Sequence, residues 1–169
     1  LWSRGLGDVY KRQVYNHYGS KAELMRALMQ RRVESITAPL RDSGAVDNPT
    51  ETLEAYARSL LETVITNKSY SMMRVVMLGA GEMPDVAQEV YEAGPLSARR
   101  QLAAFLQAET ELGRMKVEDF DQAAEIFSGM VMGQTQMRSL LRLPSEKTPD
   151  EYGRLAREAA VRFMRAYAP

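Results

Sequence analysis

Apolar side chains recur every three or four positions along most of the chain, which is the spacing of one face of an α-helix. The stripe through Leu24, Leu28 and Ile36 predicts a helix over residues 21–38, ended by Pro39 because the residue before a proline avoids helical geometry. Similar stripes predict further helices from residue 48 or 50 to about 67, and over residues 69–80, 85–93, 96–112, 118–141 and 149–167. No segment alternates polar and apolar residues at every second position. The predicted fold is therefore all-α, a bundle of about seven to nine helices.

Glycine, proline and threonine mark where these helices start, bend or stop. Gly94 and Pro95 should break or kink the chain, because proline lacks a backbone donor and clashes with the preceding turn. Gly113 suits a helix C-cap, and Thr148 suits an N-cap. Residues 69–80 are apolar on more than one face, so we expect this helix to be buried on most sides.

Composition excludes several classes of protein. The 169 residues are 45% hydrophobic and 26% charged, an ordinary globular balance. With no cysteine there is no disulfide framework or thiolate zinc site, and with a single histidine a di-iron bundle or a nucleophile–base triad lacks its ligands or base. No apolar run approaches the length of a membrane span. We expect a soluble cytoplasmic protein with no membrane partner, no metal, no cofactor and no enzymatic activity.

The net charge of zero hides an asymmetry between the two parts of the chain. Residues 1–41 contain eight Lys/Arg and three Asp/Glu, or +5, so the remaining residues carry −5. A basic end on an acidic body suits a small nucleic-acid-binding head on a different kind of core. Chance composition is the alternative explanation.

The sequence Tyr-Asn-His-Tyr-Gly-Ser-Lys-Ala-Glu-Leu over residues 15–24 is the most informative motif. Ser20 and Glu23 have the spacing of a capping box at the start of a helix, and the glycine before them suits a tight turn. The string resembles the end of the recognition helix and the start of the next helix in the TetR family of bacterial transcriptional regulators. The resemblance implies that four side chains contact phosphates of operator DNA: Tyr15, Asn16, His17 and Lys21. An ordinary helix corner with a capping box is the plainer interpretation.

Residues 1–13 do not resemble the helices that precede this motif in the family. Residues 8–13 can be encoded by GAT GTG TAT AAG AGA CAG, which looks like a transposon end used to fragment DNA for sequencing. We therefore interpret residues 1–13 as a non-native, adapter-derived segment and residues 14–41 as the remnant of a truncated DNA-binding domain. A native basic arm is the alternative for residues 1–13.

By the same resemblance, residues 48–169 form a domain that binds an effector and dimerises. Methionine adapts to different partners, so a cavity lined by methionine and aromatic residues suits a small hydrophobic effector. The candidate lining residues are Met73, Met77, Tyr91, Phe105, Phe127 and Met130, although plain core packing is the simpler role for each of them.

The last two predicted helices are the expected homodimer interface. Gly129 and Gly133 lie four apart on the long apolar helix, where small residues permit close approach of a partner helix. Together these features predict a ligand-responsive, DNA-binding transcriptional repressor. The alternatives are a ligand-binding and dimerisation domain without DNA binding, or a helical ligand carrier.

Overall fold

The structure, a computed structural model, describes residues 21–41, 48–66 and 68–169, and these ranges contain helices and no strand. The all-α prediction is confirmed. The elements in chain order are α2 (Lys21–Arg41), α3 (Pro49–Ile65), α4 (Lys68–Gly79), α5 (Pro84–Tyr91), the π-helical turn η2 (Glu92–Leu96), α6 (Ser97–Glu111), α7 (Phe120–Leu140) and α8 (Pro149–Ala166).

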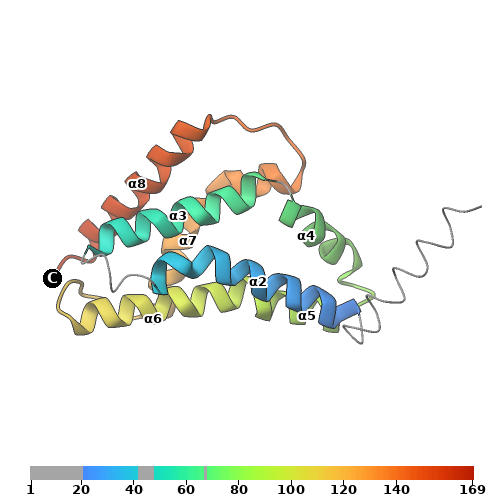
Figure 1. The fold of residues 1–169 in the computed structure, drawn as a ribbon, viewed down its shortest axis with the longest axis horizontal. Coiled ribbons are helices and arrows are strands. Elements are labelled where there is room, and N and C mark those ends of the chain that lie inside the picture. Colours follow the sequence, from blue (N-terminus) through green and yellow to red (C-terminus); the bar gives the residue numbers. More distant parts are fainter. Residues whose placement is uncertain (1–20, 42–47, 67) are drawn as a thin grey trace, which may run out of the picture.

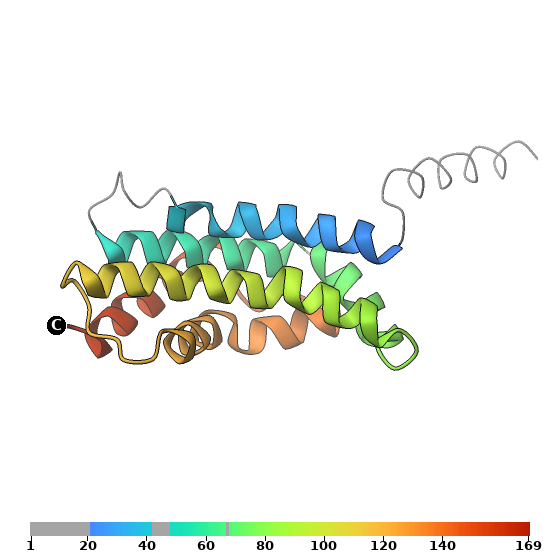
Figure 2. The same cartoon turned by 90° about the horizontal axis from the view of Figure 1, so that it is seen from below.

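The helices form an elongated bundle (Figures 1 and 2). Helix α2 lies beside α6, and α3 packs against α2 on one side and α8 on the other. Helix α7 contacts α6, α3 and α8. Helix α2 begins at the end of the molecule far from the C-terminus, where α4 and α5 also lie (Figure 1). Each of the long helices therefore packs against two to four neighbouring elements.

The main core lies where α3, α6, α7 and α8 meet. Its centre is a chain of aromatic rings: Tyr56 stacks on Phe127 with ring centroids 6.2 Å apart, and Phe127 meets Phe163 edge-on at 5.0 Å. All three side chains are almost completely buried. Burial of each such side chain stabilises the fold by about 2–3 kcal/mol. A smaller cluster of Met29, Val76 and Val90 joins α2, α4 and α5.

Side-chain caps fix the starts of α3 and α8 as the sequence predicts. The Asn48 side chain accepts a hydrogen bond from the backbone amide of Thr50 at 3.0 Å. Thr148 and Glu151 form a reciprocal capping box, which lowers the pKa of the Glu151 carboxyl through hydrogen bonds from Thr148. Gly113 adopts φ +72° after α6 and completes a hydrogen-bonded helix end that favours glycine.

The predicted stop at Pro39 is wrong, because α2 continues to Arg41. Pro39 lies in the last turn, so it removes only one backbone hydrogen bond of the helix. Arg41 also folds back along α2 and donates hydrogen bonds to the Glu34 carbonyl at 2.7 Å and the Thr37 hydroxyl at 2.8 Å. These contacts hold the final turns together.

The predicted break at Gly94 and Pro95 takes the form of a wide helical turn. The amide of Ser97 donates to the carbonyl of Glu92, so the chain passes from α5 through η2 into α6 without leaving helical geometry. A π-turn tolerates the missing donor of Pro95. Gly94 is buried against α2, where an added Cβ would lie 3.0 Å from the sulfur of Met29. Glycine therefore permits the close approach of η2 to α2.

The pattern predicts one regular helix over residues 118–141, but α7 bends at Gly133. Gly133 has φ 40° and ψ −132°, a conformation that side-chain-bearing residues avoid. Beyond the bend, the Ser139 hydroxyl donates to the Val64 carbonyl of α3 at 2.8 Å, and Arg74 of α4 donates to the Ser139 carbonyl at 2.9 Å. These contacts direct the second half of α7 away from the axis of the first half.

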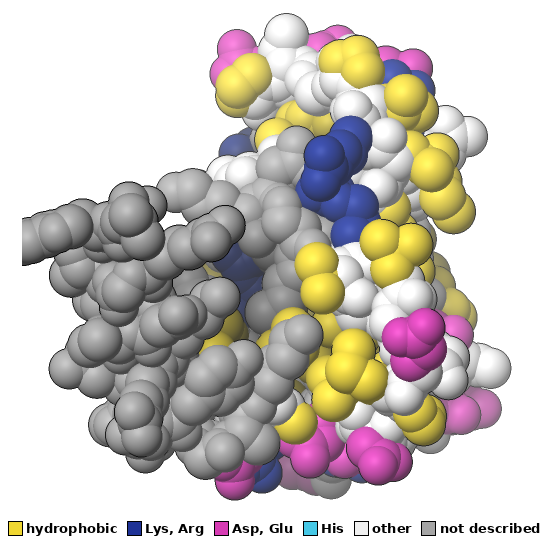
Figure 3. Space-filling model, turned by 90° about the vertical axis from the view of Figure 1, so that its right-hand side faces the viewer, with side chains coloured by type: hydrophobic (Ala, Val, Ile, Leu, Met, Phe, Trp, Pro, Cys, Tyr) yellow, Lys and Arg dark blue, Asp and Glu magenta, His cyan; other side chains and the backbone are white. Residues whose placement is uncertain are grey.

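The expectation that residues 69–80 are buried on most sides is also wrong. Val76 is buried, but the Leu78 side chain is 88% exposed and that of Met77 57% exposed. Helix α4 lies at the end of the bundle, so only part of its surface meets α3, α5 and α7. Seen from that end, hydrophobic side chains lie among charged ones on the surface (Figure 3).

Candidate effector-binding cavity

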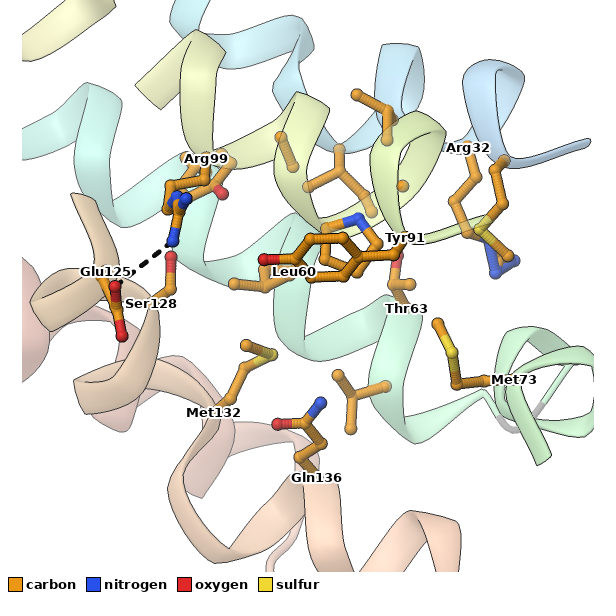
Figure 4. A pocket seen from close by; sticks show the side chains of 18 residues that line it. Arg32, Leu60, Thr63, Met73, Tyr91, Arg99, Glu125, Ser128, Met132 and Gln136 are labelled. Carbon is orange, nitrogen blue, oxygen red and sulfur yellow. Dashed lines mark hydrogen bonds and ion pairs between the residues drawn. The ribbon is translucent and has the colours of Figure 1, made fainter. Parts of the chain in front are cut away.

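A cavity of about 220 Å³ opens between the first half of the bundle and α7 (Figure 4). Its walls come from α2, α3, the last residue of α5, η2, the start of α6 and both halves of α7, with Met73 contributed by α4. Most of the wall is apolar, and the side chains of Ile36, Leu60 and Met132 are among those that form it. A concave, mainly apolar space with a few polar groups is the usual form of a small-molecule site.

Arg32 of α2 supplies an unpaired charge at one end of the cavity. Its Nη1 atom is buried, and within the part of the chain that the structure describes it makes no hydrogen bond. Burial lowers the pKa of this guanidinium from its ordinary value because desolvation disfavours the charged form. A buried donor without an acceptor is costly, so this nitrogen is a candidate ligand contact.

The opposite end carries a neutralised pair. Arg99 Nη1 lies 3.2 Å from a carboxylate oxygen of Glu125, which links α6 to α7 across the cavity mouth (Figure 4). Both groups are partly exposed, so the pair contributes little to stability. It nevertheless leaves no excess charge at this end.

Two tyrosines shape the remaining wall. Burial raises the pKa of Tyr56 to about 12, and its hydroxyl is hydrogen-bonded to Ser128, so this part of the wall is neutral. The Tyr91 ring lies between Arg32 and the Arg99–Glu125 pair, and Met132 and Gln136 of α7 lie on the other side of the space (Figure 4). The cavity therefore offers a mainly apolar space with Arg32 at one end.

Comparison with known proteins decides the family. Residues 51–169, well over half of the chain, match the family model of the AefR-like transcriptional repressor C-terminal domain. The chain belongs to the TetR family of transcriptional regulators. Members of this family are transcription factors rather than enzymes. No curated protein matches the sequence.

Solved TetR-family structures share the fold of this regulator. A protein from Mesorhizobium loti, described as a TetR-family transcriptional regulator, is 21% identical with a TM-score of 0.78 over 94% of this chain and 81% of its own. The flavonoid-responsive regulator FrrA is 28% identical with a TM-score of 0.73 over the same shares of the two chains. A TetR regulator from Agrobacterium tumefaciens is 22% identical with a TM-score of 0.67, over 94% of this chain and 77% of its own.

The six predicted ligand residues of the regulator fall into three groups. Met73 and Tyr91 line the cavity. Phe105 and Phe127 are buried in the main core, outside the cavity wall. Met77 and Met130 are exposed on the surface of α4 and α7. The cavity thus brings two of the six together, and ligand contact by any of them stays a prediction.

The polar residues of the cavity were missed by the sequence reasoning. Arg32, Arg99 and Gln136 all lie on amphipathic helices, where a charged or amide side chain normally faces solvent. Arg32 carried a signal nonetheless, since it falls on the same stripe as Leu28 and Ile36. An arginine on an apolar stripe indicates either a buried partner or a binding site.

The predicted DNA contacts lie at the edge of what the structure describes. Tyr15, Asn16 and His17 lie outside the described residues, as do residues 1–13. Lys21 is the first residue of α2.

Within the described ranges, none of the helices combines the length and apolar character needed to cross a bilayer.

Proposed function

We propose that this regulator is a ligand-responsive repressor that binds double-stranded operator DNA as a homodimer. The observation that supports ligand response is the position of α2. This helix supplies Met29, Arg32 and Ile36 to the cavity wall, and its first four residues belong to the motif of residues 15–24. One rigid element therefore adjoins both the cavity and the predicted DNA contacts.

The proposed mechanism is a shift between two conformations. An effector in the cavity binds better to the arrangement in which α2 is displaced, and the same displacement changes the spacing of the two DNA-binding heads. Residues 48–169 form the effector-binding and dimerisation domain in this proposal, and residues 14–41 belong to the DNA-binding part. FrrA is flavonoid-responsive by name, and a small hydrophobic effector for this chain agrees with that.

The proposed dimer interface is formed by α7 and α8. Ile126 and Met130 are exposed, and they lie one helical turn apart on α7. Between them, Gly129 has open space where a Cβ would be, so a partner helix can approach closely. In a two-fold dimer, this small apolar surface would be buried on both subunits.

Dimerisation is tested by measuring mass in solution by light scattering. Ile126→Asp places a charge in the proposed interface and should convert dimer to monomer. Leu112→Asp is the matched control, because Leu112 is an exposed leucine at the end of α6, away from that surface. An unchanged mass for Ile126→Asp contradicts the proposed interface.

DNA binding is tested with the complete gene product and its own promoter fragment. We expect binding that weakens steeply with salt, because phosphate contacts release counterions. Lys21→Ala should lower affinity by roughly tenfold without altering sequence preference, since phosphate contacts position a protein without reading bases. Arg100→Ala, an exposed arginine of α6, is the control and should bind normally. Absence of salt-sensitive binding would favour a helical ligand-binding or carrier protein instead.

A further inference from the structure

The charges around the cavity do not balance. The described lining contains two arginines and one glutamate, and the glutamate is already paired with Arg99 at 3.2 Å. Figure 4 places Arg32 at the opposite end from this pair, with Tyr91 between them. Arg32 is therefore the uncompensated cation of the described lining, and its buried Nη1 atom has no hydrogen-bond partner among the described residues.

The polar groups nearest to the middle of the cavity do not supply the missing acceptor. The Tyr56 hydroxyl is hydrogen-bonded to Ser128, and the Ser128 hydroxyl donates to the Ala124 carbonyl at 2.9 Å. A guanidinium prefers the planar, two-oxygen geometry of a carboxylate. A bound carboxylate would pair with Arg32 and return the hydrogen bond that burial removes.

The volume of the cavity limits the size of the remainder of the ligand. A dry cavity of about 150 Å³ holds one benzene ring. About 220 Å³ therefore suits one aromatic ring with an arm of two or three atoms. The lining residues Leu60, Tyr91 and Met132 offer apolar contacts to such a ring.

We propose that the cavity binds a small aromatic carboxylate of one ring and a short arm, with the carboxylate on Arg32 and the ring beside Tyr91. This inference rests on the proposed function of the cavity as the effector site. It adds the chemical class of the effector and names Arg32 as the residue that selects it. The Arg99–Glu125 pair carries no net charge, so the carboxylate is assigned to Arg32 rather than to Arg99.

The test is calorimetric titration of the complete protein with trans-cinnamate and with its neutral isostere cinnamamide. Wild type should bind cinnamate at least about tenfold more tightly than the amide, because a hydrogen-bonded charge pair replaces a neutral contact. In Arg32→Gln the preference for the acid should vanish while amide binding remains. Arg31→Gln is the matched control, because Arg31 is the exposed neighbour on the same helix and should keep the preference.

Thermal melts separate a binding role from a structural one. Arg32→Gln without ligand should melt at or above the temperature of wild type, because it removes a partly desolvated charge whose buried Nη1 has no partner among the described residues. A lower melting temperature, with the acid preference intact, would make Arg32 a structural residue and overturn the inference.

Neutral indole distinguishes failure of this inference from failure of the proposed function. If indole or the amide binds and cinnamate shows no preference that depends on Arg32, the cavity remains an effector site and the carboxylate assignment is overturned. If neither the acid, the amide nor indole binds at millimolar concentration, both the assignment and the proposed effector site are overturned.

Discussion

The two ends of the bundle differ in how completely their buried side chains are packed and hydrogen-bonded. At the core end, Tyr56, Phe127 and Phe163 pack ring against ring, and the buried carboxylate of Glu109 receives two bonds from Arg114 at 2.6 and 3.0 Å. At the cavity end, η2 replaces a regular helical turn, α7 bends, and Arg32 has a buried nitrogen without a partner.

The difference shows how one chain combines stability with a site for binding. Irregular backbone and unsatisfied polar groups cost free energy, and they persist where the surrounding structure holds them in place. The aromatic core and the paired carboxylate supply that support. We therefore expect substitutions at the core end to change stability strongly and those at the cavity end to change ligand response.

The largest effect should come from removing the central ring of the core. Phe127 is 0% exposed, and Phe127→Ala should lower the free energy of unfolding by about 4 kcal/mol through lost burial and a new cavity. Met132→Ala, on the same helix but at the cavity wall, should cost about 1 kcal/mol. Urea unfolding measures both. Equal losses would remove the distinction between the two ends.

The next effect should come from breaking the buried ion pair. Arg114→Met leaves the 4%-exposed Glu109 without its partner and should cost about 3 kcal/mol. Arg162→Met breaks the exposed pair with Glu158 and should change stability by less than about 0.5 kcal/mol. A small loss for Arg114→Met would mean that the core end does not depend on this pair.

Two glycines of α7 allow a sharper test of the bend. Gly133→Ala should lower the free energy of unfolding by about 2 kcal/mol, because an alanine residue is strained at a backbone φ of 40°. Gly129→Ala should stabilise by about 0.5–1 kcal/mol, since Gly129 is helical and has open space around it. Both are measured by thermal melts in the Ile126→Asp background, so that no partner helix contributes. A neutral Gly133→Ala would show that the bend is not fixed by this residue.

The last effect appears only at alkaline pH. The pKa of Tyr56 is about 12 in the folded protein and about 10 in the unfolded chain, so the folded state keeps its proton longer. Stability should fall by about 1.4 kcal/mol per pH unit between pH 10 and 12 from this group alone. Tyr56→Phe should remove that slope, and Tyr91→Phe, at an exposed ring, should retain it. Parallel profiles for wild type and Tyr56→Phe would contradict this account.

The local sequence pattern is sufficient to predict features that depend on residues close together in the chain. The caps at Asn48 and Thr148 depend on side chains reaching backbone groups two or three residues away. The sequence predicts the cap at Thr148, and it gives residue 48 as one of two alternatives for the start of α3. The break at Gly94 and Pro95 was also predicted, but its form was not. Whether a proline stops, kinks or widens a helix depends on what packs over it, here α2 through Met29.

The candidate site was predicted less well for the same reason. The sequence indicated apolar and aromatic residues, and Phe127 and Tyr91 satisfy that description equally. Only the packing separates them, since Phe127 is enclosed between Tyr56 and Phe163 whereas Tyr91 lies at the cavity. Periodicity shows which face of a helix is buried and not whether that face meets another side chain or an open space.

The sequence by itself determined the helical class, the main helix caps, the motif at residues 15–24 and the resemblance to the TetR family. Each of these depends on residues close together along the chain. The tertiary structure alone decided that α7 bends at Gly133, that α4 leaves Leu78 exposed, and that the Nη1 atom of Arg32 is buried with no partner in the described ranges. These features depend on where distant helices meet, because packing decides which neighbours surround a side chain and whether its polar atoms find hydrogen-bond partners.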